Sequence, residues 1–550
     1  SWHNFFYVAA EPGGAVSVDK PPLGLWIQAA SAAVFGVNGF GVLFPEMLAG
    51  VLSVVLVYYL VKRSFGVPAG LLAGTVLAVA PVAVATDRNN TMDSLLIFTL
   101  LLAAWAFIKA TESGRTRYLM LGAVLVGLGF NIKMLEAFLP LPAFYALYFL
   151  GAPDKLWHKV LKLAGASVLL LVISLSWAVA VDLTPAEARP YVGSSGNNTV
   201  LNLIVGYNGV NRLMGMGANR NLQVGTPLTG ANSSMQPGAV NTPQMPGTGF
   251  NGGSRPQANG SLPQMGNVPG GAQSNNGTDG NTPRAWNNNN NNGTQRRDGN
   301  NAMPFTNGGM AGQPGNMGGP GGGMGGGFPG TGRAGVLRLF TQPLSKEVSW
   351  LLPFALFAIA LLLFSSRLKW PLSLQHQSAV LWGGWLLTGG TFFSIAGFFH
   401  EYYLSMLAAP LAALVGIGCI VLWQLGKRHH WLASGLVLAA AGGTLAFQMM
   451  TAYSFTQTIA WMPAMWALFT LGAVLLVFVN IRIQRLKTKQ NLRMEDETLN
   501  LHPEEGPNGR SIMPLLASLG LACIMASMLI TPAIWSWYTN QYSSGNQSLP

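Results

Sequence analysis

Charge is scarce in this sequence. Asp, Glu, Lys and Arg together make up only 9% of the 550 residues, whereas hydrophobic residues make up 50%. Soluble globular domains carry about 25% charged residues, which keep their surfaces hydrated. The shortage of charge therefore excludes an ordinary soluble domain and predicts an integral membrane protein.

Cysteines and nucleotide-binding motifs are also few or missing. The two cysteines, Cys419 and Cys523, lie inside apolar runs, which disfavours a disulfide framework and a cysteine-based metal site. No Walker loop is present, and no dinucleotide-binding glycine fingerprint follows a strand-like segment, so a nucleotide-driven pump is disfavoured. The net charge is +12, but the basic residues sit in short separate loops, so we expect no nucleic-acid partner.

Long hydrophobic runs recur along the chain between short polar loops. Each is close to the length that a helix needs to cross a hydrocarbon core of roughly 30 Å. A further run, 23–37, is shorter and is better interpreted as an interfacial or re-entrant helix. We predict an all-α polytopic membrane protein of about twelve spans, near residues 42–61, 68–86, 93–111, 117–134, 136–151, 160–181, 348–366, 378–396, 403–424, 431–450, 460–481 and 512–531.

The basic loops predict how these helices are oriented. If the spans alternate, the loops rich in Lys and Arg fall on one side of the bilayer, which the positive-inside rule identifies as the cytoplasm. Because residue 1 then lies outside and is not Met, we expect one more span upstream of it. The segments predicted to face outwards are 1–22, 87–92, 182–347, 397–402 and 451–459.

Composition divides the chain into segments. The tract 216–333 is rich in Gly, Asn, Pro and Met and cannot bury enough apolar surface to offset its chain entropy, so we predict a disordered outer loop. The functional alternative for this tract is a flexible tether. The preceding segment, 182–215, is predicted to be ordered. The other predicted segments are an N-terminal membrane core (1–181), C-terminal membrane helices (334–484), a charged cytoplasmic segment (485–511), a last helix (512–531) and an outer tail (532–550).

One polar motif opens the chain, Asp19-Lys20-Pro21-Pro22, directly before an apolar helix. A lysine held at the membrane edge by a rigid Pro-Pro corner is well placed to meet a lipid phosphate. The alternative is a juxtamembrane lysine that only anchors the end of a helix.

Further polar residues interrupt the apolar runs on the predicted outer side. Asp87, Arg88 and Asp93 surround the start of one span, where Asp93 is either a helix N-cap or part of a catalytic or metal site. Lys133 lies on the outer side against the positive-inside preference. It is therefore either a snorkelling side chain or a partner for a phosphate.

A last polar group, His400-Glu401-Tyr402-Tyr403, opens another span. His400 and Glu401 are candidate metal ligands or members of a proton relay, while the two tyrosines also suit an aromatic belt. No His-Glu-x-x-His spacing supports a zinc site.

Eight short motifs occur along the first 425 residues in the same order as in a known family of proteins. The chain resembles bacterial mannosyltransferase-like proteins of glycosyltransferase family 39, relatives of the protein O-mannosyltransferases and of the lipid A aminoarabinose transferase. The motifs are Ser1-Trp2-His3-Asn4-Phe5-Phe6, Glu11-Pro12-Gly13-Gly14, Val18-Asp19-Lys20-Pro21-Pro22-Leu23-Gly24, Thr86-Asp87-Arg88-Asn89-Asn90-Thr91-Met92-Asp93, Asn131-Ile132-Lys133-Met134, Arg189-Pro190-Tyr191-Val192-Gly193, Gly206-Tyr207-Asn208-Gly209 and His400-Glu401-Tyr402-Tyr403-Leu404.

The resemblance implies a GT-C fold with an outward-facing cavity and a polyprenyl-phosphate sugar as the donor. It implies that Asp93 and Asp87 line the catalytic site. It also places the general base of the family in a loop that would precede Ser1. The residues implied to bind substrate, with Arg88 added on charge grounds, are Lys20, Arg88, Lys133, His400 and Tyr402. A divalent metal is the one cofactor considered, with Asp19 and His400 as its ligands.

The predicted function is a glycosyltransferase in a bacterial plasma membrane. It would move a hexose, with mannose implied by the family, from the lipid-linked donor to a lipid, glycan or protein acceptor on the outer face. A transporter or flippase for lipid-linked sugars, which needs Lys20 but not Asp93, is the alternative from another class. A membrane scaffold that displays 216–333 is a third.

Overall fold

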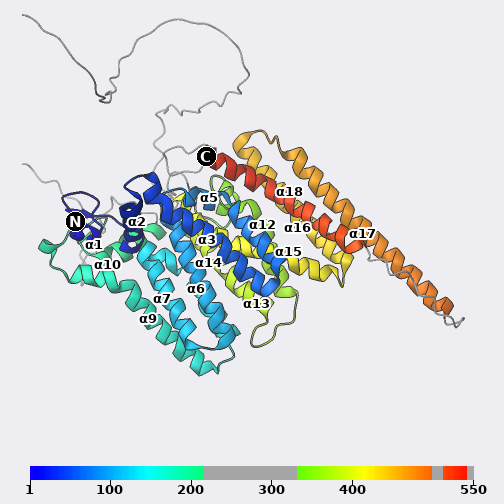
Figure 1. The fold of residues 1–550 in the computed structure, drawn as a ribbon, viewed down its shortest axis with the longest axis horizontal. Helices are drawn as coiled ribbons and strands as arrows, with labels where there is room; N and C mark the ends of the chain where they lie inside the picture. The colour runs from blue at the N-terminus through cyan, green and yellow to red at the C-terminus, as the bar shows by residue number, and fades with distance from the viewer. Residues whose placement is uncertain (215–330, 498–511, 542–550) are drawn as a thin grey trace, which may run out of the picture. The chain divides into compact units, whose positions relative to one another are not determined.

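The computed structural model describes residues 1–214, 331–497 and 512–541, with backbone alone for 490–497, and these parts are almost entirely helical (Figure 1). The predicted disordered loop 216–333 lies outside the described residues except for its last three positions. The long helices are α3 (Gly39–Phe65), α6 (Asp93–Ser113), α7 (Thr116–Lys133), α9 (Leu156–Leu183), α15 (Ala408–Gly426), α16 (His430–Thr456), α17 (Met462–Glu497) and α18 (Met513–Gln541).

Shorter helices connect them and cover their ends. They are α1 (Trp2–Tyr7), α2 (Pro22–Phe35), α4 (Val67–Ala78), α5 (Pro81–Asp87), α8 (Leu141–Gly151), α10 (Val200–Asn202), α11 (Asn211–Met214), α12 (Leu352–Phe364), α13 (Leu374–Ser378) and α14 (Gly384–Ile395). Leu203–Val210 and Ala379–Gly383 are π-helical. Segments of 3-10 helix are Met134–Phe138, Ala186–Ala188, Arg338–Phe340, Leu344–Lys346, Ser349–Leu351 and Glu401–Leu407. Two short parallel strands, β1 (Val16–Ser17) and β2 (Tyr191–Val192), pair Val16 with Tyr191.

The membrane-spanning character is confirmed, but the count of twelve spans is not. Within the described ranges, eight helical segments are long and apolar enough to cross a membrane, or nine if α4 and α5, bent by 64°, form one span. The expected spans 136–151, 348–366 and 378–396 correspond to shorter or interrupted helices. Proline contributes to this difference, because α8 and α12 each begin at a proline-containing first turn that cannot extend an upstream helix.

The run 23–37, expected to be interfacial or re-entrant, forms α2. This helix begins at Pro22, with Pro21 as its N-cap, and ends at Gly36, whose φ is +88°. Its 14 residues span about 21 Å, which is too short to cross the hydrocarbon core.

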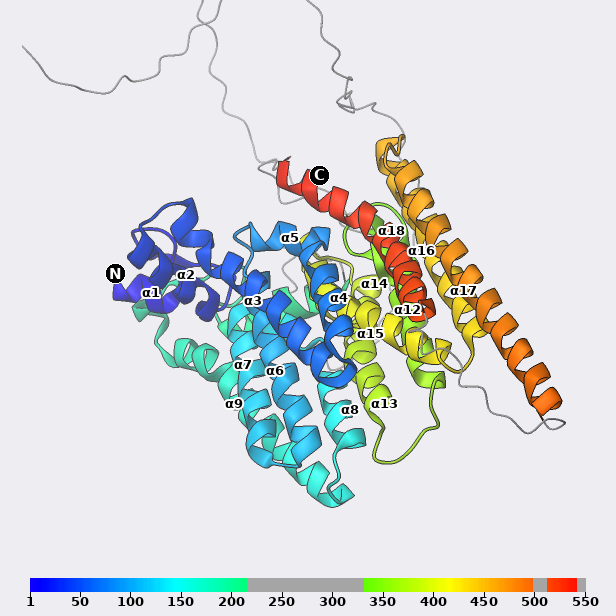
Figure 2. The ribbon, with the colours of Figure 1, turned by 45° about the vertical axis from the view of Figure 1, so that its right-hand side comes forward.

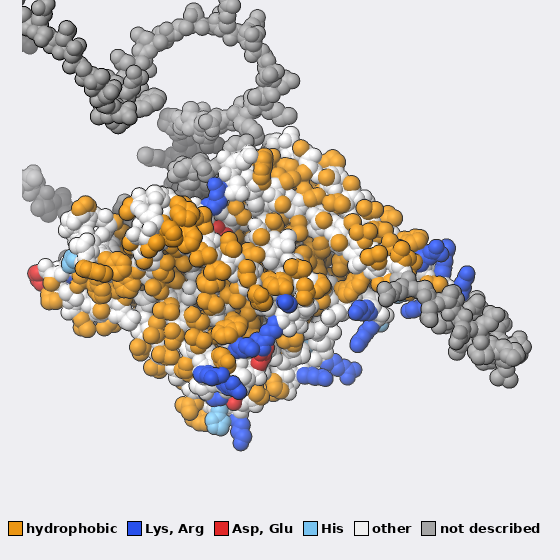
Figure 3. Space-filling view, viewed as in Figure 1, with side chains coloured by type: hydrophobic (Ala, Val, Ile, Leu, Met, Phe, Trp, Pro, Cys, Tyr) orange, Lys and Arg blue, Asp and Glu red, His pale blue; other side chains and the backbone are white. Residues whose placement is uncertain are grey.

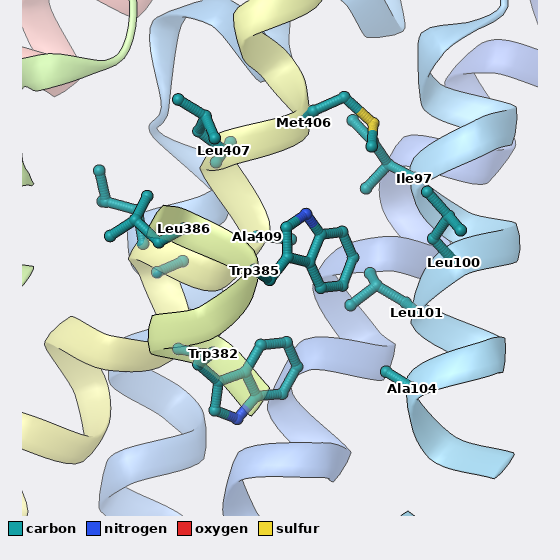
Figure 4. Close-up of a cluster of buried hydrophobic side chains, with 14 of the residues drawn as sticks. Ile97, Leu100, Leu101, Ala104, Trp382, Trp385, Leu386, Met406, Leu407 and Ala409 are labelled. Carbon is teal, nitrogen blue, oxygen red and sulfur yellow. The ribbon is translucent and has the colours of Figure 1, made fainter. Parts of the chain in front are cut away.

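The core of the bundle is centred on α15. Of its most apolar stretch, 94% is buried, against 28% in α17, so α15 is enclosed by protein while α17 lies at the periphery. Figure 4 shows Trp382 and Trp385 pointing from the helix that includes α14 towards Leu101 of α6. In Figure 3 the visible surface is mostly hydrophobic, and Lys and Arg side chains gather along its lower and right-hand edges, as a membrane protein with asymmetric loops requires.

Small residues let α15 approach α4. A Cβ atom added at Gly416 would lie 2.5 Å from the carbonyl oxygen of Ala69 and 2.9 Å from Cβ of Ala73, both in α4. Glycine is therefore required for this close contact, as is common where membrane helices pack through van der Waals contact.

Replacing Gly416 with Ala should lower the stability of the protein by roughly 1–3 kcal/mol, because the two helix backbones would have to move apart. Gly435→Ala in α16 is the matched control, since a Cβ atom there meets nothing within 4 Å. The apparent melting temperature in detergent micelles measures both. A melting temperature for Gly416→Ala at or above that of Gly435→Ala would contradict the packing.

A buried carboxyl group lies just before α12. Glu347 has no exposed surface and neither of its carboxylate oxygens has a hydrogen-bond partner among the described residues. Lys346 Nζ lies 4.0 Å from Glu347 Oε1. Burial raises the pKa of Glu347 to about 8, with Lys346 opposing the shift and Glu401 adding to it.

Stability should therefore fall as pH rises from about 4.5 to about 8 and level off above it. The folded protein retains a proton on Glu347 up to a pKa of about 8, whereas the unfolded chain releases it near 4.5, so deprotonation favours unfolding. Glu347→Gln should remove most of this dependence, and the melting temperature measured between pH 5 and pH 9 tests it. A wild-type profile parallel to that of the variant would contradict the assignment.

Candidate functional site

A buried ion pair joins the adjacent ends of α6 and α7. Asp93 is the first residue of α6 and Lys133 is the last residue of α7, and the two helices pack side by side (Figure 2). Lys133 Nζ lies 2.5 Å from Asp93 Oδ1, and the two side chains are 5% and 0% exposed. Charges removed from water are tolerated only when they are paired, so each of these groups depends on the other.

The simpler interpretations of these two residues are wrong. Asp93 is not the N-cap of α6, because Met92 occupies that position and Asp93 follows it. Lys133 does not snorkel to solvent, because it is only 7% exposed. Both residues belong to the interior of the helix bundle.

Lys133 has further partners on two sides. Glu136 Oε2 lies 3.3 Å from Lys133 Nζ. The same nitrogen lies 3.8 Å from the ring centroid of Tyr403 and 4.9 Å from that of Tyr402, a cation–π arrangement. Tyr403 is 1% exposed and is therefore not part of an aromatic belt. The ammonium group is enclosed by two carboxylates and two aromatic rings.

The backbone next to the ion pair is unusual at both partners. Met92 precedes Asp93 with φ of +62°, and Met134 follows Lys133 with φ of +48°. Positive φ at a residue other than glycine costs of order 1–3 kcal/mol and is concentrated at functional sites. The turn at Met92 begins α6 and the turn at Met134 ends α7. Asp93 and Lys133 can therefore meet, and Glu136 lies close to the same lysine.

Two more acidic residues lie around the start of α6. Glu46 of α3 is fully buried, and its Oε2 accepts the backbone N–H of Leu95 at 3.2 Å. Asp87, the last residue of α5, accepts a hydrogen bond of 2.6 Å from Ser94 Oγ. The positive end of the α6 dipole favours such negative charge.

A more exposed group borders this cluster. Lys20 Nζ lies 3.7 Å from Asp19 Oδ1, and both side chains are 28% exposed. Helix α2, which begins just after them, contacts the loop before Asp93. A Cβ atom at Gly24 would lie 2.7 Å from Met92 Sδ, and Gln28 Nε2 donates a hydrogen bond of 2.6 Å to Asn90. The rigid Pro-Pro corner thus fixes Lys20 beside the start of α6.

The helical segment 200–214 covers another side of the cluster around Lys133. The guanidinium of Arg212 lies 5.0 Å from the ring of Tyr403 and 5.7 Å from that of Tyr207. Its Nε is buried without a hydrogen-bond partner among the described residues. The backbone N–H of Phe398 donates to the carbonyl oxygen of Arg212, which joins this segment to the strip that leads into His400.

His400 is uncharged at neutral pH. Its ring stacks on Tyr402 with centroids 5.3 Å apart. Burial, together with the positive charges of Arg212, Lys20 and Lys133, lowers the pKa of His400 to about 4, while Asp19 opposes the shift. These electrostatic effects indicate that Lys20, Arg212 and Lys133 all lie within range of the imidazole.

Arg88, which was predicted to bind the substrate, contacts another part of the chain. Arg88 donates hydrogen bonds to the carbonyl oxygen of Thr539 and to Asn540 Oδ1 in α18, at 3.2 and 2.6 Å, so its hydrogen bonds go to α18 and not to the acidic cluster. No group of three or more His, Cys, Asp or Glu residues able to hold a metal occurs in the described part of the chain. Asp19 pairs with Lys20 and lies within electrostatic range of His400, and a metal held by Asp19 and His400 stays a prediction.

Sequence reasoning did not single out several members of the cluster. Glu46 lies within an expected span, and an acidic residue there was in itself a signal of a functional or paired group. Glu136 follows Lys133 at the i+3 spacing that allows a helical ion pair. Arg212 had no such signal, because only tertiary structure brings it to Tyr403.

Known proteins resemble this chain in part of its sequence, in its fold and over its whole length. Residues 19–177 match the family model described as dolichyl-phosphate-mannose-protein mannosyltransferase. Solved structures of ArnT from Cupriavidus metallidurans, in the apo state and bound to undecaprenyl phosphate, are 15% identical. They align with TM-scores of 0.41 and 0.43 over 97% and 94% of this chain and 71% and 67% of theirs. An undecaprenyl phosphate-alpha-4-amino-4-deoxy-L-arabinose arabinosyl transferase of Pseudomonas aeruginosa (strain UCBPP-PA14) is 34% identical over 31% of this chain and 32% of its own.

Two full-length matches come from Bacillus subtilis (strain 168). "Putative mannosyltransferase YkcB" is 37% identical over 568 residues, and "Putative mannosyltransferase YycA" is 39% identical over 558 residues. Both alignments cover 100% of this chain, with 70% of YkcB and 72% of YycA. The resemblance to mannosyltransferases is thereby confirmed, and the chain belongs to the family of membrane glycosyltransferases that includes YkcB and YycA.

Proposed function

We propose that the protein transfers a hexose, specifically mannose, from a polyprenyl-phosphate carrier to an acceptor on the extracytoplasmic face of a bacterial plasma membrane. The names of its relatives support the sugar and the lipid carrier. The observation that carries the proposal is the half-exposed Lys20 at the edge of the buried cluster around Lys133. A positively charged side chain at the surface of this buried polar cluster can stabilise the negative charge of a lipid-bound leaving group.

Lys20 is the proposed contact for the donor phosphate. When the bond between the sugar and the phosphate breaks, negative charge develops on the phosphate oxygens, and a fixed ammonium group lowers the energy of that transition state. His400, neutral because its pKa is about 4, would act as a hydrogen-bonding group and not as a second cation. Tyr402, stacked on it, would line the same surface.

Asp93 and Asp87 are proposed to act by positioning. Asp93 has no exposed surface and is paired with Lys133, and Asp87 accepts a hydrogen bond from Ser94 in the first turn of the same helix. The pairing of Asp93 with Lys133 holds the outer ends of α6 and α7 together beneath Lys20. Lys133 and Arg212 would supply positive potential behind the phosphate, in surroundings that exclude water.

A transfer assay in proteoliposomes tests the proposal. With radiolabelled polyprenyl-phosphate-mannose and a crude membrane acceptor fraction, the wild-type protein should label the acceptor. Lys20→Ala should lower transfer about 100-fold or more, since it removes a group that stabilises the leaving phosphate. Asp93→Asn should lower the turnover number by about 10–100-fold, because Lys133 loses its closest partner and the site is misplaced.

Lys155→Ala is the matched control, because this exposed lysine lies in the loop before α9. It should transfer label at the wild-type rate. Movement of the donor across the bilayer without labelling of an acceptor, unchanged by Asp93→Asn, would favour the flippase instead. Equal transfer from donors that carry other sugars on the same lipid would remove mannose as the specific substrate.

A further inference from the structure

A cavity lies far from the acidic cluster. It has a volume of about 440 Å³ and is lined by α15, α16, α17 and α18. Ser405, at the other end of the helical segment that includes α15, lies 3.5 Å from Asp93, whereas the cavity borders Lys427 at the C-terminal end of α15. The 19 residues of α15 separate the two sites by about 28 Å. The cavity is within the size range of ligand sites but is not the site of transfer.

The walls of this cavity are apolar. Leu422, Val437, Leu476 and Leu521 line it from four different helices. Two polar side chains of the lining are paired, since Asn480 Nδ2 donates a hydrogen bond of 2.9 Å to Ser434 Oγ. A mainly apolar interior is suited to an acyl chain and not to a sugar.

Positive charge gathers along the lining. Lys427 and Lys487 are exposed, and neither takes part in an ion pair with any residue that the structure describes. His430 also lines the cavity, and its Nδ1 is buried without a hydrogen-bond partner in the described ranges. Two cations and a free imidazole nitrogen next to an apolar hollow are complementary to a lipid with an anionic head group.

The surroundings indicate where such a lipid would come from. Helix α17 is only 28% buried over its most apolar stretch, so one wall of the cavity belongs to a helix that faces the bilayer. Lys427 and Lys487 belong to the basic end of these helices, which the positive-inside rule identifies as the cytoplasmic end. The inner leaflet carries most of the anionic phospholipid that such residues attract.

We propose that this cavity binds one anionic glycerophospholipid of the inner leaflet. One acyl chain would fill the space between α16, α17 and α18, and the phosphate would lie between Lys427, Lys487 and His430. A bound lipid would join the peripheral helices α17 and α18 to the enclosed helix α15. The site is separate from the transfer chemistry and does not depend on it.

Native mass spectrometry of the purified protein, incubated with phosphatidylglycerol or phosphatidylcholine, tests the proposal. The wild-type protein should retain one phosphatidylglycerol and little phosphatidylcholine. Each lysine near an anionic surface contributes about fivefold in affinity, so the double variant Lys427→Gln/Lys487→Gln should bind phosphatidylglycerol at least tenfold more weakly. Ala517→Trp, which fills the apolar part of the cavity, should lower retention without changing any charge.

Lys489→Gln is the matched control, because this lysine lies on the same helix but outside the cavity lining. It should retain phosphatidylglycerol as the wild type does. Three results would overturn the proposal: no lipid retained by the wild type, phosphatidylcholine retained as strongly as phosphatidylglycerol, or equal losses in the double variant and the control.

Discussion

The burial of Lys133 is the constraint on which the rest of the site depends. An ammonium group without water must be surrounded by partners, and here Asp93, Glu136 and the rings of Tyr402 and Tyr403 provide them. These partners come from α6, from the segment after α7 and from the segment before α15. Neutralising one cation therefore fixes three distant parts of the chain relative to each other. The positive φ angles on either side of the pair add an unfavourable contribution that the packed core must offset.

Lys20 and Asp93, which lie far apart in the sequence, differ in their exposure to solvent. The side chain of Lys20 is 28% exposed beside a proline corner, whereas Asp93 is fully buried and paired with Lys133. In the proposed function, the phosphate of a lipid-linked donor approaches within the membrane plane and meets the ammonium group of Lys20 at the start of α2. The basic loops at the opposite ends of the helices serve orientation in the bilayer, and at α15 to α18 they border an apolar cavity.

Much of this could be predicted from sequence, and the limits have physical causes. A charged residue in an apolar run is expensive, which is why Asp93 and Lys133 stood out before their contact was known. The partner of each was not predictable, because the two residues lie 40 positions apart, at the two ends of a helical hairpin whose register depends on packing. Arg88 stood out for the same reason, yet its hydrogen bonds run to Thr539 and Asn540 of α18. Hydrophobic length alone also predicts one continuous span at 68–86, because it does not register the 64° bend between α4 and α5.

The most direct measurement is the structure of the protein in lipid nanodiscs with undecaprenyl phosphate bound, determined by electron cryomicroscopy. The proposed function predicts phosphate density in contact with Lys20 Nζ and facing His400 and Tyr402, with the Asp93–Lys133 pair intact beneath it. Phosphate density at another position, with none beside Lys20, would contradict the account and would assign Lys20 to anchoring the end of α2.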